Sequence, residues 1–468
     1  MTPEPLTFIF TRVVLVALAF AVLLAGAIVT GLLDFLAPDG RIDRLPAVAS
    51  LVLYWALLFV LLWLIPAALR YRTYAVLVMV SSGIALGAAE MAARLFVPGA
   101  TSVRMTSGGL PSPDLHHILP PNARMYVGNF EGKHVFLDTN EDGLRTEYSK
   151  EEFLRHRERV IVLGDSFAFG LGVTHDDAFA KQLEANLRHA ADGTDVAVLN
   201  AGIISYSPFL ARLLLERRLV EYRPTFVMLL LDATDIGDDH RYMSEAIHKE
   251  GMTTFPMRDE KPVPYRGALF ELARPYYRRL LTAVTYPIGV VRALQGDGLT
   301  TAAGPYDYYE FTVMVDDTRE DNRFFIYRHP LEKTRHYFDQ TLRNVDQIAK
   351  LAHDIGAGFA LVITPRFHHW NQAEAPENWE AYKYKLDEPY QFEYFRYFDD
   401  ATGTRDYPII NLLPDFQATD KYPLVFRHDP HWNANGHAFA ADAVHGHLVN
   451  RRLFRSRQSP GARLHLSP

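Results

Sequence analysis

Two short segments, far apart in the chain, carry side chains that together could perform nucleophilic catalysis. Ser166 lies in the stretch VIVLGDSFAFG, residues 160–170, and Asp429 and His431 lie in the stretch HDPHWNANGH, residues 428–437. A serine hydroxyl becomes an effective nucleophile when a histidine takes its proton, and an acid beside the histidine fixes its tautomer and stabilises the imidazolium. Ser166, His431 and Asp429 are therefore candidates for nucleophile, general base and orienting acid.

The segments around these residues alternate between strand and helix patterns. Apolar strand patterns cover residues 159–163, 196–200, 225–231, 359–364 and 408–412, and helical patterns cover residues 176–189, 208–222, 331–355 and 434–450. Such alternation predicts an α/β domain in which a parallel sheet carries helices on both faces. In sheets of this kind the active crevice lies beyond the carboxyl ends of the strands, so Ser166 stands where chemistry is expected. The plainer alternative is an ordinary turn in which Asp165 and Ser166 cap the next helix.

Polar residues also follow the second and third strands. The second is followed by Asn200, Gly202 and Ser205, and the third by Thr234 and Asp235. These loops could supply the donors that stabilise a developing oxyanion. A purely structural hydroxyl is an equal alternative for Thr234, because threonine often bonds nearby backbone. Asp235 is expected to act mainly as a structural acid.

Other candidates near strand ends favour plainer interpretations. The third strand is followed by an acidic cluster, Asp232, Asp235, Asp238 and Asp239. Its spacing does not match a calcium-binding loop of the EF-hand type, so we predict no metal and no cofactor. His368 and His369 follow the fourth strand, and we expect them to be solvent-exposed loop residues.

Composition excludes several classes of function. The net charge of −7 gives no reason to expect nucleic acid as a partner. The chain has no cysteine, which excludes disulfides, thiolate zinc sites and a cysteine nucleophile. Apolar residues crowd the first hundred positions, and residues 13–33, 47–69 and 74–97 are each long enough to span a bilayer of about 30 Å. The sequence thus predicts a retained anchor of three transmembrane helices, with membrane lipid as a partner.

The rest of the chain divides by composition. Residues 98–137 form a predicted linker and entry segment, residues 138–455 the α/β domain, and residues 456–468 a tail. Two insertions are expected, at about 238–330 and 366–405. The second contains the aromatic stretch YQFEYFRYF, residues 390–398, for which core packing is favoured over stacking on sugar rings. The short loop with Arg70 and Arg72 favours a cytoplasmic position for that loop, which places the α/β domain outside the cytoplasm.

Taken together, the motifs resemble the SGNH (GDSL-type) hydrolase superfamily. The resemblance rests on Gly164-Asp165-Ser166-Phe167 near the start of the sheet and Asp429-x-His431 near its end, and NEDGLRTE, residues 140–147, is similar to the entry segment of membrane-anchored members. It implies a flavodoxin-like fold, Ser166 as nucleophile and first oxyanion donor, His431 as base and Asp429 as its acid. The DxHW form of the last block resembles acetyltransferases that modify exopolysaccharides.

Three positions depart from that family pattern. In the last block the acid, Asp429, lies two residues before His431, and His428 stands where many members have the acid. The other two departures lie in the predicted oxyanion loops. Ser205 stands where an oxyanion glycine is usual, and Thr234 stands where an asparagine is usual. The resemblance implies a serine esterase or O-acyltransferase of the bacterial inner membrane, acting on acyl esters of a cell-envelope or secreted polysaccharide. Other membrane proteins of a modification or export system are implied partners. Two alternatives stay open: a catalytically degraded domain that binds polysaccharide or scaffolds a membrane complex, and a membrane-complex subunit whose helices are its functional part.

Overall fold

A computed structural model describes the chain over residues 109–190, 195–249, 251–256 and 312–450, without 372, 379–383 and 385–388. It also describes strand β1 (Val103–Arg104) and the single positions 88, 92, 95 and 96. The chain divides into two compact units, Met1–Ser102 with Asp259–Gly304, and Val103–Arg258 with Pro305–Pro468. Nearly all of the described residues belong to the second unit. Among the described residues no helix is long and apolar enough to cross a bilayer, and the three predicted spans lie outside them apart from those four positions.

A five-stranded parallel sheet forms the centre of the described unit, in the order β14-β13-β8-β6-β7. Its strands in chain order are β6 (Glu158–Leu163), β7 (Val196–Asn200), β8 (Phe226–Leu231), β13 (Gly358–Ile363) and β14 (Ile409–Asn411). The second strand of the chain therefore pairs outside the first, and the third, fourth and fifth follow on the other side. This is the flavodoxin-like strand order, in which successive strands are added first on one side of β6 and then, from β8 onward, on its other side. The predicted α/β class and its parallel sheet are thus confirmed.

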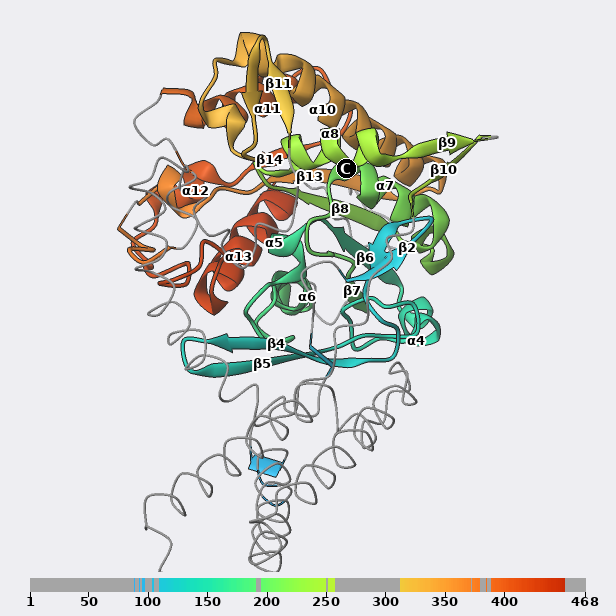
Figure 1. Ribbon diagram of the computed structural model, residues 1–468. Helices are drawn as coiled ribbons and strands as arrows, with labels where there is room; N and C mark the ends of the chain where they lie inside the picture. The colour runs from blue at the N-terminus through green and yellow to red at the C-terminus, as the bar shows by residue number, and fades with distance from the viewer. Residues whose placement is uncertain are drawn as a thin grey trace, which may run out of the picture. The chain divides into compact units, whose positions relative to one another are not determined.

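The helices form two groups, one on each face of the sheet (Figure 1). In one group α6 (Phe179–Ala190) packs against α13 (Ala434–Asn450). In the other, α10 (Leu331–Asp354) packs against α7 (Pro208–Arg217) and α8 (Asp235–Glu245). The remaining helices are short: α4 (Lys150–Arg155), α5 (Ser166–Phe169), α11 (Glu393–Thr402), α12 (Leu413–Ala418) and the 3-10 helices η2 (Leu219–Tyr222), η3 (Phe325–Tyr327), η4 (Phe367–His369) and η6 (Pro389–Phe392).

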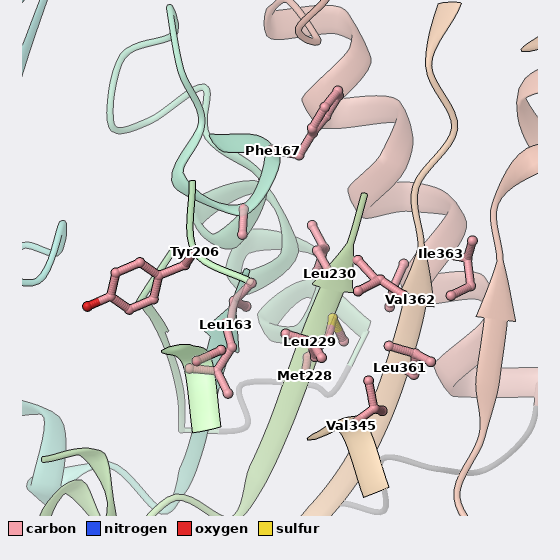
Figure 2. Close-up of a cluster of buried hydrophobic side chains, with 14 of the residues drawn as sticks. Leu163, Phe167, Tyr206, Met228, Leu229, Leu230, Val345, Leu361, Val362 and Ile363 are labelled. Atoms are coloured by element: carbon pink, nitrogen blue, oxygen red, sulfur yellow. The ribbon is translucent and has the colours of Figure 1, made fainter. Parts of the chain in front are cut away.

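The core explains why the central strands read as continuous apolar runs. Every residue of β8, FVMLLL, is buried, because helices cover both faces of the sheet. Figure 2 shows Leu229 and Leu230 of this strand beside Leu361 and Val362 of β13, with Val345 of α10 packed near them. Each leucine buried in this way contributes about 1.5–3 kcal/mol relative to an exposed one.

The segment predicted as a linker is instead largely structured. It forms a β2–β3 hairpin (Leu110–Ser112 and His116–Ile118) and the strands β4 (Arg124–Phe130) and β5 (Lys133–Asp138), which pair with each other. Leu115 and Leu119 are buried and pack in the hydrophobic core, and the Pro, Ser and Gly residues of this stretch lie among short strands. The sequence interpretation mistook turn residues for a linker.

The two predicted insertions are partly described. The first contains the hairpins β9–β10 (Ile247–Lys249 and Met252–Thr254) and β11–β12 (Val313–Val315 and Thr318–Glu320). In the aromatic stretch, Tyr394, Phe395, Tyr397 and Phe398 are buried in α11. These four rings pack in the core, as the favoured interpretation expected.

Candidate active site

Ser166 is the first residue of α5, at the carboxyl end of β6. Gly164 has a φ of 142°, and a Cβ atom there would lie 2.6 Å from the backbone oxygen of Leu230. Only glycine fits this tight junction. Asp165 then caps the helix, since its side chain accepts a hydrogen bond from the Phe167 backbone N–H at 2.8 Å. The Gly-Asp-Ser sequence therefore both makes the turn and presents the serine at the sheet edge.

The three candidates for the catalytic triad lie together. His431 Nε2 is 2.8 Å from Ser166 Oγ, and His431 Nδ1 is 2.5 Å from Asp429 Oδ1. The Asp429 carboxylate also accepts the backbone N–H of His431 at 3.0 Å, which holds the turn of the loop. With Nδ1–H donating to Asp429, Nε2 is free to accept the Ser166 proton, which is the tautomer a general base needs. Only 8% of Ser166 and 9% of His431 is exposed, so water has limited access to this chain of contacts.

Opposing effects set the pKa of His431. Burial acts to lower this pKa, but the charge and hydrogen bond of Asp429 outweigh it, so the pKa lies above the ordinary histidine value. The Asp165 carboxylate adds to the rise, and the guanidinium of Arg366 opposes it. His431 can therefore accept a proton only while the pH stays above this raised pKa.

Asp165 makes a second contact with the nucleophile. Ser166 Oγ lies 3.2 Å from Asp165 Oδ2, farther than from His431 Nε2. A hydroxyl has one proton to donate, so the shorter contact favours donation to His431. Burial and the neighbouring Asp232 raise the pKa of Asp165 to about 6.

The loop after β7 braces α5. Asn200 Nδ2 donates to the Phe169 carbonyl at 3.1 Å, and Asn200 Oδ1 accepts the Gly202 N–H at 3.0 Å. A Cβ on Gly202 would lie 2.3 Å from the Phe169 nitrogen, so only glycine allows this approach. Ser205 follows in the same loop, with a buried side chain and a φ of 63°. Asn200 and Gly202 thus support the helix that carries Ser166.

The residues after β8 hold one another. Thr234 donates to Asp232 Oδ2 twice, from its hydroxyl at 2.6 Å and from its backbone N–H at 3.0 Å. The Thr234 hydroxyl proton is therefore engaged by Asp232, and the structural alternative describes it better than the oxyanion role. Asp235 Oδ2 accepts the Asp232 N–H at 2.9 Å, and burial raises the pKa of Asp235 well above its usual range. Asp235 therefore acts as a structural acid, held by its contact with the Asp232 backbone N–H.

Arg366 is a residue of this site that the sequence interpretation missed. It lies just beyond β13, and its guanidinium forms a bidentate ion pair with Asp232, with Nε 3.0 Å from Oδ1 and Nη2 2.7 Å from Oδ2. Burial acts to raise the pKa of Asp232, but this ion pair and the Thr234 donors lower it to about 2. Nothing in the run TPRFHH, residues 364–369, distinguishes this arginine from a surface one.

The expectation for the neighbouring histidines was wrong. His368 is 4% exposed and His369 is 3% exposed, because the loop after β13 turns inward under α11 and the rings pack against Tyr384 and Phe395. Burial lowers the pKa of His369 to about 3, so this ring is neutral at pH 7.

Arg145, in the entry segment NEDGLRTE, is a second missed residue. Its side chain is 1% exposed and donates to the carbonyls of Phe169, Gly170 and Val173 at 2.6–2.7 Å. These carbonyls end α5 and begin the loop that follows it. A cation there complements the negative end of a helix. Within the described ranges, no group of three or more His, Asp or Glu side chains is arranged to hold a metal ion.

Comparisons with known proteins give distant structural likenesses only. No family model and no curated protein matches the chain. Among solved structures, TesA is 14% identical and covers 63% of this chain and 99% of its own, with a TM-score of 0.32. The chain is similar at the same level to the acetylxylan esterase Axe2 from Geobacillus stearothermophilus, with 13% identity over 64% of this chain and 98% of Axe2 and a TM-score of 0.31. It is also similar to the psychrotrophic esterase EstA from Pseudoalteromonas sp., with 13% identity over 63% of this chain and 97% of EstA and a TM-score of 0.29. None of these likenesses is close enough to assign a function, so the contacts within this chain decide what its site can do.

Proposed function

We propose that the chain is a serine esterase or O-acyltransferase of the SGNH type, which cleaves acyl esters through an acyl-serine intermediate. The observation that carries this proposal is the unbroken series of contacts from Asp429 through His431 to Ser166 at the carboxyl edge of the sheet. A turn that only capped a helix would not need a histidine on the serine hydroxyl or a carboxylate behind that histidine.

The geometry supports a two-step reaction. His431 Nε2 takes the Ser166 proton as Oγ attacks the ester carbonyl carbon, and the carbonyl oxygen becomes a tetrahedral oxyanion. The backbone N–H groups of Ser166 and Ser205 are the proposed oxyanion donors. His431 then returns the proton to the departing alcohol oxygen as the carbon–oxygen bond breaks. Attack on the acyl-serine by water completes hydrolysis, and attack by a sugar hydroxyl completes acyl transfer.

The setting of the reaction is proposed from sequence. The three apolar segments before residue 98 support an anchor in the bacterial inner membrane, and the arginine-bearing loop supports a catalytic domain on its outer side. The Asp429-x-His431-Trp432 block supports a polysaccharide of the envelope or a secreted polysaccharide as the acyl carrier. A reporter fused to the carboxyl terminus tests the orientation: activity of an export-dependent reporter supports it, and activity of a cytoplasm-dependent reporter contradicts it.

The test of the chemistry uses the full chain in detergent, wild type beside Ser166→Ala. We expect the wild type to hydrolyse p-nitrophenyl acetate and to be labelled at Ser166 by a fluorophosphonate. The variant should stay at the uncatalysed rate and take no label. A wild type that does neither, while folded by circular dichroism, contradicts the proposal.

One observation favours a second candidate function. The Thr234 hydroxyl is engaged by Asp232, so this position gives no side-chain donor to an oxyanion. Loss of one such donor lowers the rate by roughly 10²–10³ in other enzymes. A catalytically degraded domain that binds polysaccharide is therefore the second candidate. Retained polysaccharide binding in a folded wild type that fails the labelling test would establish it.

A further inference from the structure

A buried ion pair between Asp232 and Arg366 lies at the same edge of the sheet as Ser166. β8 and β13 are neighbours in register, with Leu231 opposite Ile363, so the residues that follow them meet at one edge of the sheet. Asp232 comes from the first strand end and Arg366 from the second, and both are buried. A bidentate pair of this kind fixes the plane of the guanidinium as well as its position.

The guanidinium packs against the residue that follows the nucleophile. The Arg366 Cζ lies 5.4 Å from the centre of the Phe167 ring and 4.9 Å from the centre of the Phe324 ring. The centre of the Phe167 ring also lies 5.1 Å from the centre of the His431 ring and 5.0 Å from the centre of the Trp432 ring. Phe167 thus connects the Arg366 guanidinium to Ser166, which precedes it in the chain, and to His431, whose ring its own ring contacts.

The Arg366 guanidinium is also a cation that Asp232 holds close enough to His431 to influence its pKa. The charged and titratable groups that face His431 are Asp429 on its own loop, Asp165 before α5, Arg366 after β13 and His437 on α13. Burial lowers the pKa of His437 to about 3, so it is neutral near pH 7. The charge of Arg366 opposes protonation of His431, and the charge of Asp165 favours it.

We propose that Arg366 is a positioning residue for this serine site: held by Asp232 and stacked on Phe167, it fixes the turn that carries Ser166 and, through the Phe167 ring, the position of the His431 ring. The proposal rests on the proposed function of the Ser166 site. The plain alternative is that the pair only stabilises the fold, as buried ion pairs between strand ends can do.

The test compares two variants that separate geometry from charge. Arg366→Lys keeps the charge but loses the planar, bidentate contact and the stacked surface. Arg366→Gln removes the charge but leaves an amide that can donate to Asp232. Arg405→Met is the control for loss of an arginine–aspartate pair at a more exposed position: Arg405 Nε lies 3.1 Å from Asp346, and its hydrogen bonds go to Asp346 and Thr404, outside the triad.

Each variant has its own expected result in the full chain. Arg366→Lys should lower kcat for p-nitrophenyl acetate, and the rate of fluorophosphonate labelling, by roughly 10- to 100-fold, since displacement of a reacting group by about 1 Å has an effect of this size. The acid limb of its pH profile of kcat/KM should stay at the same pH as in the wild type. Arg366→Gln should lose a similar factor and move the acid limb upward by about half a pH unit to one unit. Arg405→Met should change neither quantity.

Two results would overturn the inference, and both differ from failure of the proposed function. If both Arg366 variants label within about twofold of the wild type, a factor worth only about 0.4 kcal/mol, the guanidinium positions nothing. If Arg366→Gln keeps the wild-type acid limb while losing stability to urea, the pair acts on the fold alone. A wild type that fails to label at Ser166 would instead contradict the proposed function. Should Arg366→Gln not fold, the labelling rate of Arg366→Lys still decides the positioning role.

Discussion

Replacing Asp429 by asparagine should disable the site while leaving its shape almost unchanged. In the native arrangement His431 Nδ1 donates to Asp429 Oδ1 at 2.5 Å, and Nε2 faces Ser166 Oγ at 2.8 Å. An asparagine amide can rotate so that its NH₂ group donates to Nδ1, which moves the ring proton to Nε2. That tautomer cannot accept the serine proton.

The size of the effect follows from this geometry. In a serine protease with a Ser-His-Asp triad, the change of the triad aspartate to asparagine lowers kcat about 10⁴-fold, because the histidine then holds its proton on the wrong nitrogen. That factor corresponds to about 5.4 kcal/mol of transition-state stabilisation. Asp429→Ala should retain more activity than Asp429→Asn, because the partly exposed position lets water accept the Nδ1 proton and keeps the useful tautomer.

The pH profile gives an independent check. Burial tends to lower the pKa of His431 and the Asp429 carboxylate raises it above the ordinary value, so removing the carboxylate lowers this pKa. The base is lost when the pH falls through the pKa, so the acid limb of the remaining activity should move to lower pH. The assay is kcat/KM for p-nitrophenyl acetate between pH 4 and 9, with Ser166→Ala as background. Activity of Asp429→Asn within tenfold of the wild type, or an acid limb that moves upward, would refute the reasoning.

Three further changes test how the nucleophile is held. Arg145→Met should lower the free energy of unfolding in urea by about 3–5 kcal/mol, because it leaves three buried carbonyls without their donor. Arg145→Lys should recover part of this loss, and equal stability of all three proteins would contradict the role. Gly202→Ala should lower both stability and Ser166 labelling, since its Cβ would lie 2.3 Å from backbone, whereas Gly403→Ala, with nothing within 4 Å, should stay within about 0.5 kcal/mol of the wild type. Thr234→Val should change kcat less than tenfold, because its hydroxyl donates to an acid; a loss of 10² or more would restore it as an oxyanion donor.

Sequence predicted the elements of the sheet well because burial on both faces leaves a strong signal. The strand predicted at 225–231 is observed at Phe226–Leu231, and the helix predicted at 434–450 is observed at Ala434–Asn450. Ser166, His431 and Asp429 could also be proposed, since few residue types perform this chemistry and parallel strands bring their ends to one edge.

What sequence could not supply is the fate of polar side chains that become buried. Arg145, Arg366 and the pair His368–His369 look like ordinary surface residues in the sequence, and all four are buried. Their burial depends on partners distant in the chain: Arg366 lies 134 positions from Asp232. The entry strands were missed for a related reason, because a proline- and glycine-rich stretch gives the same local pattern in a linker and in a set of tight turns.

The charges at the strand ends balance one another, which is what a site with a single buried base requires. The pKa of Asp232 is lowered and its carboxylate pairs with Arg366, whereas burial raises the pKa of Asp235. Asp165, with a pKa raised to about 6, is then the carboxylate beside Ser166 that titrates near neutral pH. In the proposed reaction, the positive charge that His431 gains with the serine proton is stabilised by its contact with Asp429 and by the nearby charge of Asp165. A site with its remaining charges already paired can stabilise that imidazolium without first reorganising its surroundings, which is the electrostatic preorganisation on which serine catalysis depends.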